Sequence, residues 1–240
     1  MKVNWNYIKG LLLLGLVAFL YGFSHQKHAV KKVHDISIEF EEGENLFMDY
    51  QMVNKMLIQN GKTVVNEAKT VIDLHKLEAT ILNHSMVESA SVYLTVDGLL
   101  KTKIKQRTPI ARVLTDSKSY YIDREAKKMP LSENHSARVL LVSGDISEAD
   151  NGKIYLLVTK ILSDEFLKKQ IIGAHKTQNN EFVLSSRIGD QNIELGKIEN
   201  LDMKFKNLKS FFNKTMTDKT IDNYSSINLK YNNQVVCTKK

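Results

Sequence analysis

Cysteine is almost absent from this chain: Cys237, close to the C-terminal end, is the only one. A single thiol has no partner within the chain, so an intrachain disulfide is excluded even in an oxidising compartment. The fold must therefore be held by its hydrophobic core. With 42% hydrophobic and 25% charged residues among 240, the composition is typical of a globular protein.

Signatures of catalysis and of cofactor binding are also missing. No G-x-S-x-G, Walker or G-x-G-x-x-G motif follows a strand pattern. Of seven histidines only His25 and His28 form a close pair, whereas a zinc site needs three or four converging ligands. His75 and Glu78 are more typical of a solvated helix face than of an acid–base pair. We therefore expect no catalytic residue, no metal site and no cofactor.

Acidic residues are missing from residues 1–34, which hold five of the seven net positive charges of the chain. The remainder has a net charge of only +2, which does not indicate a nucleic-acid-binding surface. A basic collar beside an apolar run is typical of the flank of a membrane anchor. No DNA or RNA partner is expected.

Charge is absent from one run, residues 10–23, with the sequence GLLLLGLVAFLYGF. As a helix this run would be about 21 Å long against about 30 Å for a bilayer core, a minimal span. We expect a transmembrane anchor over residues 10–24 and a cytoplasmic tail over residues 1–9, with the bulk of the chain outside the cytoplasm. A cleaved signal peptide is the alternative, with Gly22 and Ser24 at its small-residue positions.

The segment after this run shows one strand and two amphipathic helices. Alternating apolar residues predict a strand over residues 33–40. Asp49 is a suitable cap for a helix that Gly61 would end, and Asp73 for a second helix that stops near His84.

Two further strands flank Asp97-Gly98, a dipeptide typical of a two-residue hairpin turn. Residues 33–107 thus have the order β-α-α-β-β, which predicts a small α+β domain with both helices on one face of a three-stranded sheet.

Beyond a seam at residues 108–115 the pattern becomes rich in strands. Strands are predicted at residues 110–114, 120–122, 139–142, 171–176, 182–186, 192–195 and 227–236, and helices at about 151–167 and 201–212. We expect a β-rich domain over residues 108–237 with helices on one face of its sheet, and the fold class α+β for the chain.

We expect no later part of the chain to cover the outer side of the last predicted strand. An unpaired strand edge is a template for a strand from a partner protein. The partner-binding residues predicted on this edge are Leu229, Lys230, Tyr231, Asn232, Asn233, Gln234, Val235 and Val236. An equally weighted alternative is that Lys230 and Lys239-Lys240 only protect the edge against aggregation.

Three segments carry motifs of a known family. Residues 84–92 (HSMVESASV) are similar to H-P-W-V-x-x-A-x-V, residues 100–113 (LKTKIKQRTPIARV) to L-x-I-x-V-x-E-R-x-P-x-A, and residues 121–131 to L-I-D-x-x-G-x-x-F. By these motifs the chain resembles the bacterial cell-division family FtsQ, also called DivIB. It departs from them at Ser85, Met86, Gln106 and Ala126, which indicates a divergent branch.

The resemblance implies one span of the inner (plasma) membrane, a POTRA domain beside it and a β domain beyond, at the division septum. It implies a non-enzymatic scaffold that binds the bitopic proteins FtsB (DivIC) and FtsL and supports septal peptidoglycan synthesis. In that family the partner adds a strand at the end of the β domain, where the motif D-L-R-Y is matched by residues 228–231. Lys230 in place of arginine keeps the charge but not the bidentate fork.

Two other functions remain open. One is an anchored extracytoplasmic enzyme of unknown class. The other is a component of a polypeptide-translocation apparatus, although such assemblies usually carry several tandem POTRA units and a membrane barrel.

Overall fold

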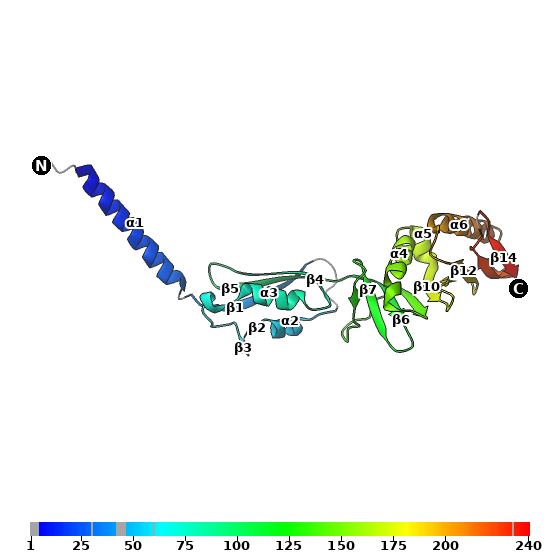
Figure 1. Cartoon of the computed structure of the whole chain (residues 1–240), viewed down its shortest axis with the longest axis horizontal. Helices are drawn as coiled ribbons and strands as arrows, with labels where there is room; N and C mark the ends of the chain where they lie inside the picture. The colour runs from blue at the N-terminus through cyan, green and yellow to red at the C-terminus, as the bar shows by residue number, and fades with distance from the viewer. Residues whose placement is uncertain (1–4, 30, 42–46, 60, 232) are drawn as a thin grey trace. The chain divides into compact units, whose positions relative to one another are not determined.

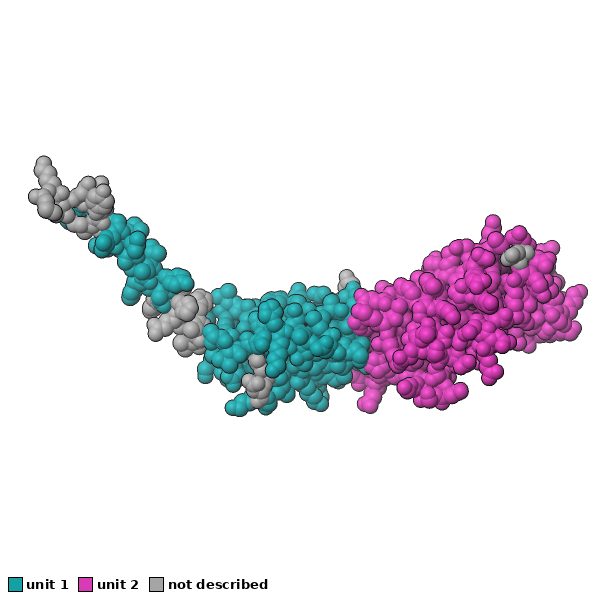
Figure 2. Space-filling view, viewed as in Figure 1, with its two compact units in different colours: residues 1–106 teal, residues 107–240 magenta. Residues whose placement is uncertain are grey.

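The computed structural model describes residues 5–29, 31–41, 47–59, 61–231 and 233–240. The chain divides into two compact units, Met1–Gln106 and Arg107–Lys240 (Figure 2). Both units combine helices with strands, which confirms the mixed α and β composition expected from the sequence.

The N-terminal helix α1 covers Trp5–Ala29 (Figure 1). Residues 9–22 are all exposed, including Leu11 at 79% and Leu14 at 72%. Within the described parts of the chain, no helix combines enough length with enough apolar character to cross a membrane.

The first unit contains a three-stranded sheet in the order β1-β5-β4, with β1 parallel and β4 antiparallel to the central β5. The elements are β1 (Asp35–Glu41), α2 (Tyr50–Met56), β2 (Ile58–Gln59), β3 (Lys62–Thr63), η1 (Lys69–Val71), α3 (Leu74–Leu82), β4 (Val87–Leu94) and β5 (Leu99–Gln106). The predicted β-α-α-β-β order is confirmed, with the small β2–β3 hairpin added.

The two faces of this sheet differ in character because side chains alternate along β5. Leu100 and Ile104 are fully buried with Val53 of α2 and Leu77 of α3. Lys101, on the opposite face, forms an ion pair of 3.9 Å with Glu39 of β1. The helices therefore cover one face, and paired charges cover the other.

Both predicted helix caps are present, but the predicted end of α2 is wrong. The Asp49 carboxylate accepts the backbone N–H of Met52 at 2.7 Å, and Asp73 caps α3 in the same way. α2 ends at Met56, because Leu57 turns into the core and Ile58 pairs with Thr63. Gly61 belongs to the β2–β3 turn.

The hairpin between β4 and β5 has a three-residue loop, Val96 to Gly98, so the two-residue prediction is wrong. The N–H of Thr95 donates to the carbonyl of Leu99 at 3.0 Å, and the N–H of Gly98 donates to that of Thr95 at 3.3 Å. Only Gly98 in this loop has a positive φ, +108°, whereas a two-residue type I′ turn needs two such residues.

Gln106 shows why one departure from the family motif is tolerated. Its amide oxygen accepts the N–H of Phe47 at 3.1 Å, and its amide nitrogen donates to the carbonyl of Met48 at 3.3 Å. A glutamate carboxylate has no proton to donate to that carbonyl. The buried amide therefore suits this site better than an ionised acid.

The second unit contains one sheet in the order β14-β13-β12-β11-β10-β9-β6-β7-β8 (Figure 1). Its strands are β6 (Pro109–Leu114), β7 (Ser119–Asp123), β8 (Lys128–Met129), β9 (Leu140–Gly144), β10 (Ile171–Lys176), β11 (Phe182–Ser186), β12 (Asn192–Gly196), β13 (Tyr224–Asn228) and β14 (Val236–Lys239). The pairs β6–β9, β9–β10 and β12–β13 are parallel, and the other pairs are antiparallel.

The helices of this unit pack on one face of the sheet. They are η2 (Glu148–Asp150), α4 (Asn151–Leu162), α5 (Glu165–Gln170), α6 (Leu201–Thr217) and η3 (Ile221–Asn223). Leu157 of α4 and Phe212 of α6 are fully buried in one core with Leu184 of β11. The single helix predicted over residues 151–167 is wrong, because Asp164 starts α5 by accepting the N–H groups of Phe166 and Leu167.

Candidate partner-binding edge

The predicted closing strand over residues 227–236 is wrong, because this part of the chain forms a hairpin. β13 ends at Asn228, β14 begins at Val236, and a loop joins them. β13 pairs with β12 on one side and with β14 on the other. Its backbone is therefore already satisfied, and it offers no edge to a partner.

The chain after β13 stays against β12 for one more residue before it turns. Leu229 is only 1% exposed, and its N–H donates to the carbonyl of Glu194 at 2.9 Å. The Asn228 side chain donates to the Glu194 carboxylate at 2.8 Å and accepts the N–H of Lys230 at 2.9 Å. The hydrogen bond of Leu229 continues the pairing with β12, whereas the hydrogen bond between Asn228 and Lys230 forms a local turn at the end of β13.

Lys230 uses its charge within the chain. Its Nζ lies 2.7 Å from a carboxylate oxygen of Glu181 and 3.4 Å from one of Glu194. The hydrogen bond to Glu181 is the main reason why the pKa of the Lys230 ammonium is raised. Lys230 therefore stabilises the loop by pairing within the chain, and its ammonium is already engaged without any partner carboxylate.

The other predicted partner-binding residues lie on the loop or at the start of β14. Tyr231 is 52% exposed, Gln234 is exposed, and Val235 packs against the core. Asn232 lies outside the described residues. Asn233 has a φ of +60°, in the left-handed region that asparagine tolerates and that reverses the chain. Of the described residues in the predicted set, Val236 alone belongs to a strand.

The open edge of the described sheet is β14. The N–H of Lys240 donates to the carbonyl of Asn223 at 2.9 Å, so alternation along the strand points the N–H of Thr238 toward β13 as well. The N–H and C=O groups of Cys237 and the N–H of Lys239 point to the other side, where no strand of the described chain pairs with β14. The Lys239 carbonyl accepts the Ser225 hydroxyl at 3.4 Å.

The sequence pattern missed this edge because VCTK has no clear alternation of apolar and polar residues. The opposite edge of the sheet, β8, has only two residues, Lys128 and Met129. A strand as short as β8 offers few backbone groups to a partner. Of the two edges, β14 is therefore the better candidate for strand addition.

The backbone N–H and C=O groups of β14 offer a partner hydrogen bonds. Burial raises the pKa of the Cys237 thiol, which keeps it protonated and weakly nucleophilic near neutral pH. Lys240 pairs with Asp190 at 2.8 Å. No group of three or more His, Cys, Asp or Glu residues suited to a metal ion occurs in the described chain.

These features define a class of protein. A small β-α-α-β-β unit is followed by a helix-covered sheet that ends in an open terminal strand, the arrangement of a POTRA-like domain joined to a β-rich domain. Models of two known families match the chain, POTRA-like domain at residues 31–105 and FtsQ/DivIB, C-terminal related at residues 108–238.

The chain belongs to the FtsQ/DivIB, C-terminal related family, and the resemblance seen in its motifs is confirmed. A search of curated proteins gives no match. Membership indicates a scaffold role in cell division, since proteins of this family are non-enzymatic components of the division complex.

Proposed function

We propose that the protein is a non-enzymatic scaffold of the bacterial division machinery that captures its partner by adding a strand to β14. The partners are bitopic membrane proteins of the FtsB (DivIC) and FtsL kinds, and the complex supports septal peptidoglycan synthesis. The open edge of β14 carries the proposal, because it presents unpaired backbone donors and acceptors at the end of the family-matched domain.

The loop before β14 supplies side-chain contacts in this proposal. Within the predicted set, residues 229–236, exposed side chains supply these contacts and others support the loop. Tyr231 and Val236, at 52% and 43% exposed, provide apolar contact for the incoming segment. Leu229 and Lys230 hold the loop in place from within the chain.

Replacing Cys237 with proline tests this mechanism. Proline removes the N–H that points to the open edge, and its ring obstructs an incoming strand. We expect affinity for the bitopic partner to fall by about tenfold or more, since one ladder hydrogen bond and its neighbours are lost. The measurement is co-purification of the full chain from membranes, with bound proteins identified by mass spectrometry.

The matched control is Cys237→Ala, which keeps the N–H and removes only the thiol. It should retain the partner at the level of the unchanged protein. If Cys237→Pro disturbs the fold in circular dichroism, Lys239→Pro and Lys239→Ala form a second pair at an exposed position. Equal partner recovery with the proline and alanine variants would contradict strand addition.

We further propose that α1 anchors the protein in the inner membrane at the septum, with residues 1–9 in the cytoplasm and residues 10–24 in the bilayer. Residues 33–107 and 108–237 are the proposed extracytoplasmic POTRA and β domains. The exposed apolar side chains of α1, such as Leu14 and Phe19, support this arrangement.

Extraction of membranes with alkaline carbonate tests the anchor. The full chain should stay in the membrane pellet. Leu14→Arg should release a large share of it, because an arginine at the centre of a span costs about 2.5–3.5 kcal/mol on insertion scales. Release of the unchanged protein at alkaline pH would show that it is only peripherally bound.

A further inference from the structure

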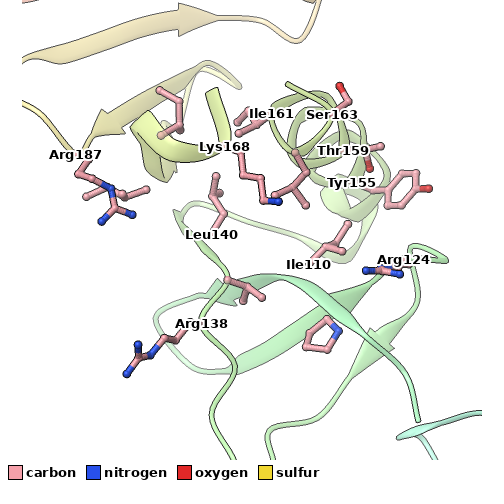
Figure 3. Close-up of a pocket in the computed structure, with 15 residues that line it drawn as sticks. Ile110, Arg124, Arg138, Leu140, Tyr155, Thr159, Ile161, Ser163, Lys168 and Arg187 are labelled. Atoms are coloured by element: carbon pink, nitrogen blue, oxygen red, sulfur yellow. The ribbon is translucent and has the colours of Figure 1, made fainter. Parts of the chain in front are cut away.

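The second unit contains a cleft of about 820 Å³ that is separate from β14. It lies where the N-terminal ends of the parallel strands β6, β9 and β10 meet α4 and α5 (Figure 3). Three strands, β11, β12 and β13, lie between β10 and β14 in the sheet, so a ligand in the cleft and a strand on the edge would use different surfaces.

The floor of the cleft is apolar. Ile110, Leu140, Ile161 and Ile171 line it and are at most 8% exposed. Ile172, also in the lining, is 45% exposed. An exposed isoleucine in the lining gains free energy when an apolar group covers it.

The charged residues of the lining all have the same sign. They are Arg124, Arg138, Lys168 and Arg187, each from a different segment, and no aspartate or glutamate lines the cleft. Among the residues that the structure describes, Arg124 and Arg138 have no side-chain hydrogen bond or ion pair. Arg187 donates its Nε to the carbonyl of Lys169 at 2.9 Å, and Lys168 has only a 3.7 Å pair with exposed Glu165.

The cations are spread along the cleft. In Figure 3, Arg138 and Arg187 lie on one side, Arg124 lies on the other, and the Lys168 ammonium points between them over Leu140 and Ile110. A single phosphate would be held best by cations that converge on one point. The observed spacing suits several anionic groups on one chain, with apolar groups between them.

We propose that this cleft binds an acidic amphipathic peptide segment of a partner protein, whose apolar side chains cover the aliphatic floor and whose carboxylates pair with the four cations. Complementary charge favours this occupant, because residues 107–240 hold 22 Lys and Arg against 16 Asp and Glu. Arginine forks bind carboxylates in a bidentate manner, so Arg124 and Arg138 fix the register of the bound segment.

Equilibrium binding of defined probes to the detergent-solubilised full chain tests the proposal. The probes are a labelled peptide of interspersed leucine and glutamate, and the same peptide with lysine in place of glutamate. The glutamate peptide should bind at least about tenfold more tightly, and its affinity should fall as salt rises. Arg124→Glu/Arg138→Glu should weaken it by at least about tenfold.

Lys214→Glu is the control, because Lys214 is an exposed cation on α6 outside the cleft. It should leave the affinity within about twofold. Equal binding of both peptides, or no effect of the double variant, would overturn the proposal. A second result would also overturn it: the double variant loses binding to phosphatidylglycerol vesicles but keeps binding to the peptide. The cleft would then be a lipid site. Cys237→Pro should leave peptide binding unchanged, which separates this result from the fate of the β14 mechanism.

Discussion

Asp123→Ala is expected to lower the free energy of unfolding of the second unit by about 3–5 kcal/mol. Asp123 is 1% exposed at the end of β7. One carboxylate oxygen lies 2.6 Å from Nη1 of Arg107, and the other accepts the N–H groups of Glu125 at 2.9 Å and Lys127 at 2.8 Å. Alanine leaves a largely buried guanidinium and two backbone donors without this acceptor.

Hydrogen exchange followed by mass spectrometry measures this effect, because it reports the second unit separately from the first. Amides of β6 and β7 should lose most of their protection in the variant. Glu125→Ala is the matched control, since Glu125 bonds the same guanidinium at 2.9 Å but is 46% exposed. Its cost should be at most about 1 kcal/mol. Similar losses in the two variants would contradict the importance assigned to the buried carboxylate.

The same turn explains another departure from the family motif. Ala126 stands where the motif has glycine, and it has a φ of +62°. A left-handed conformation costs an L-residue about 1–2 kcal/mol. Asp123 offsets this cost, because its carboxylate and its carbonyl accept the N–H groups of Lys127 and Ala126 within the turn.

Gly144→Ala is expected to destabilise the second unit by at least about 3 kcal/mol. Gly144 ends β9 with a φ of +109°, and a Cβ there would lie 2.1 Å from the carbonyl oxygen of Lys176. That carbonyl accepts the N–H of Asp145 at 3.1 Å. The buried ammonium of Lys176 in turn lies 2.5 Å from the Asp145 carbonyl and 3.2 Å from the Asp150 carboxylate. A methyl group at residue 144 would displace all of these contacts.

Gly152→Ala is the control for this prediction. Gly152 lies in the first turn of α4, and a Cβ there would meet no atom within 4 Å. Alanine should stabilise the protein by up to about 1 kcal/mol through its higher helix propensity. Urea unfolding of both variants gives the comparison. Equal effects of the two substitutions would show that backbone shifts accommodate the methyl group at residue 144.

Local patterns predicted most of the first unit, because its elements follow one another closely in the sequence and their apolar residues recur at regular intervals. Asp49 and Asp73 precede helical stripes, and β4 and β5 alternate cleanly around their turn. The errors at Gly61 and at Asp97-Gly98 are local too. Gly61 was expected to end a helix but lies in the β2–β3 turn, and Asp97-Gly98 marked a turn correctly but not its length; in both cases pairing of the flanking residues decided the outcome.

The candidate site was predicted less well. Alternating apolar residues in INLKYNNQVV favour one strand, and the family motif lies within it. Leu229 instead enters the core beside β12, and Lys230 reaches Glu181 and Glu194, which are distant in sequence. An alternation of apolar residues with a period of two does not show which strand will pair with the segment. The sequence pattern therefore placed the exposed edge before β14.

By itself, the sequence determined the apolar N-terminal run, the absence of a disulfide, the β-α-α-β-β order and the family to which the motifs point. These follow from composition and from neighbours within one or two turns of helix or strand. Tertiary structure decided that β13 is covered and β14 is open, that Asp123 bonds Arg107, and that four separate segments bring cations to one cleft. Each of these depends on contacts between residues far apart in the chain, and such contacts form only when the nine-stranded sheet has a definite strand order.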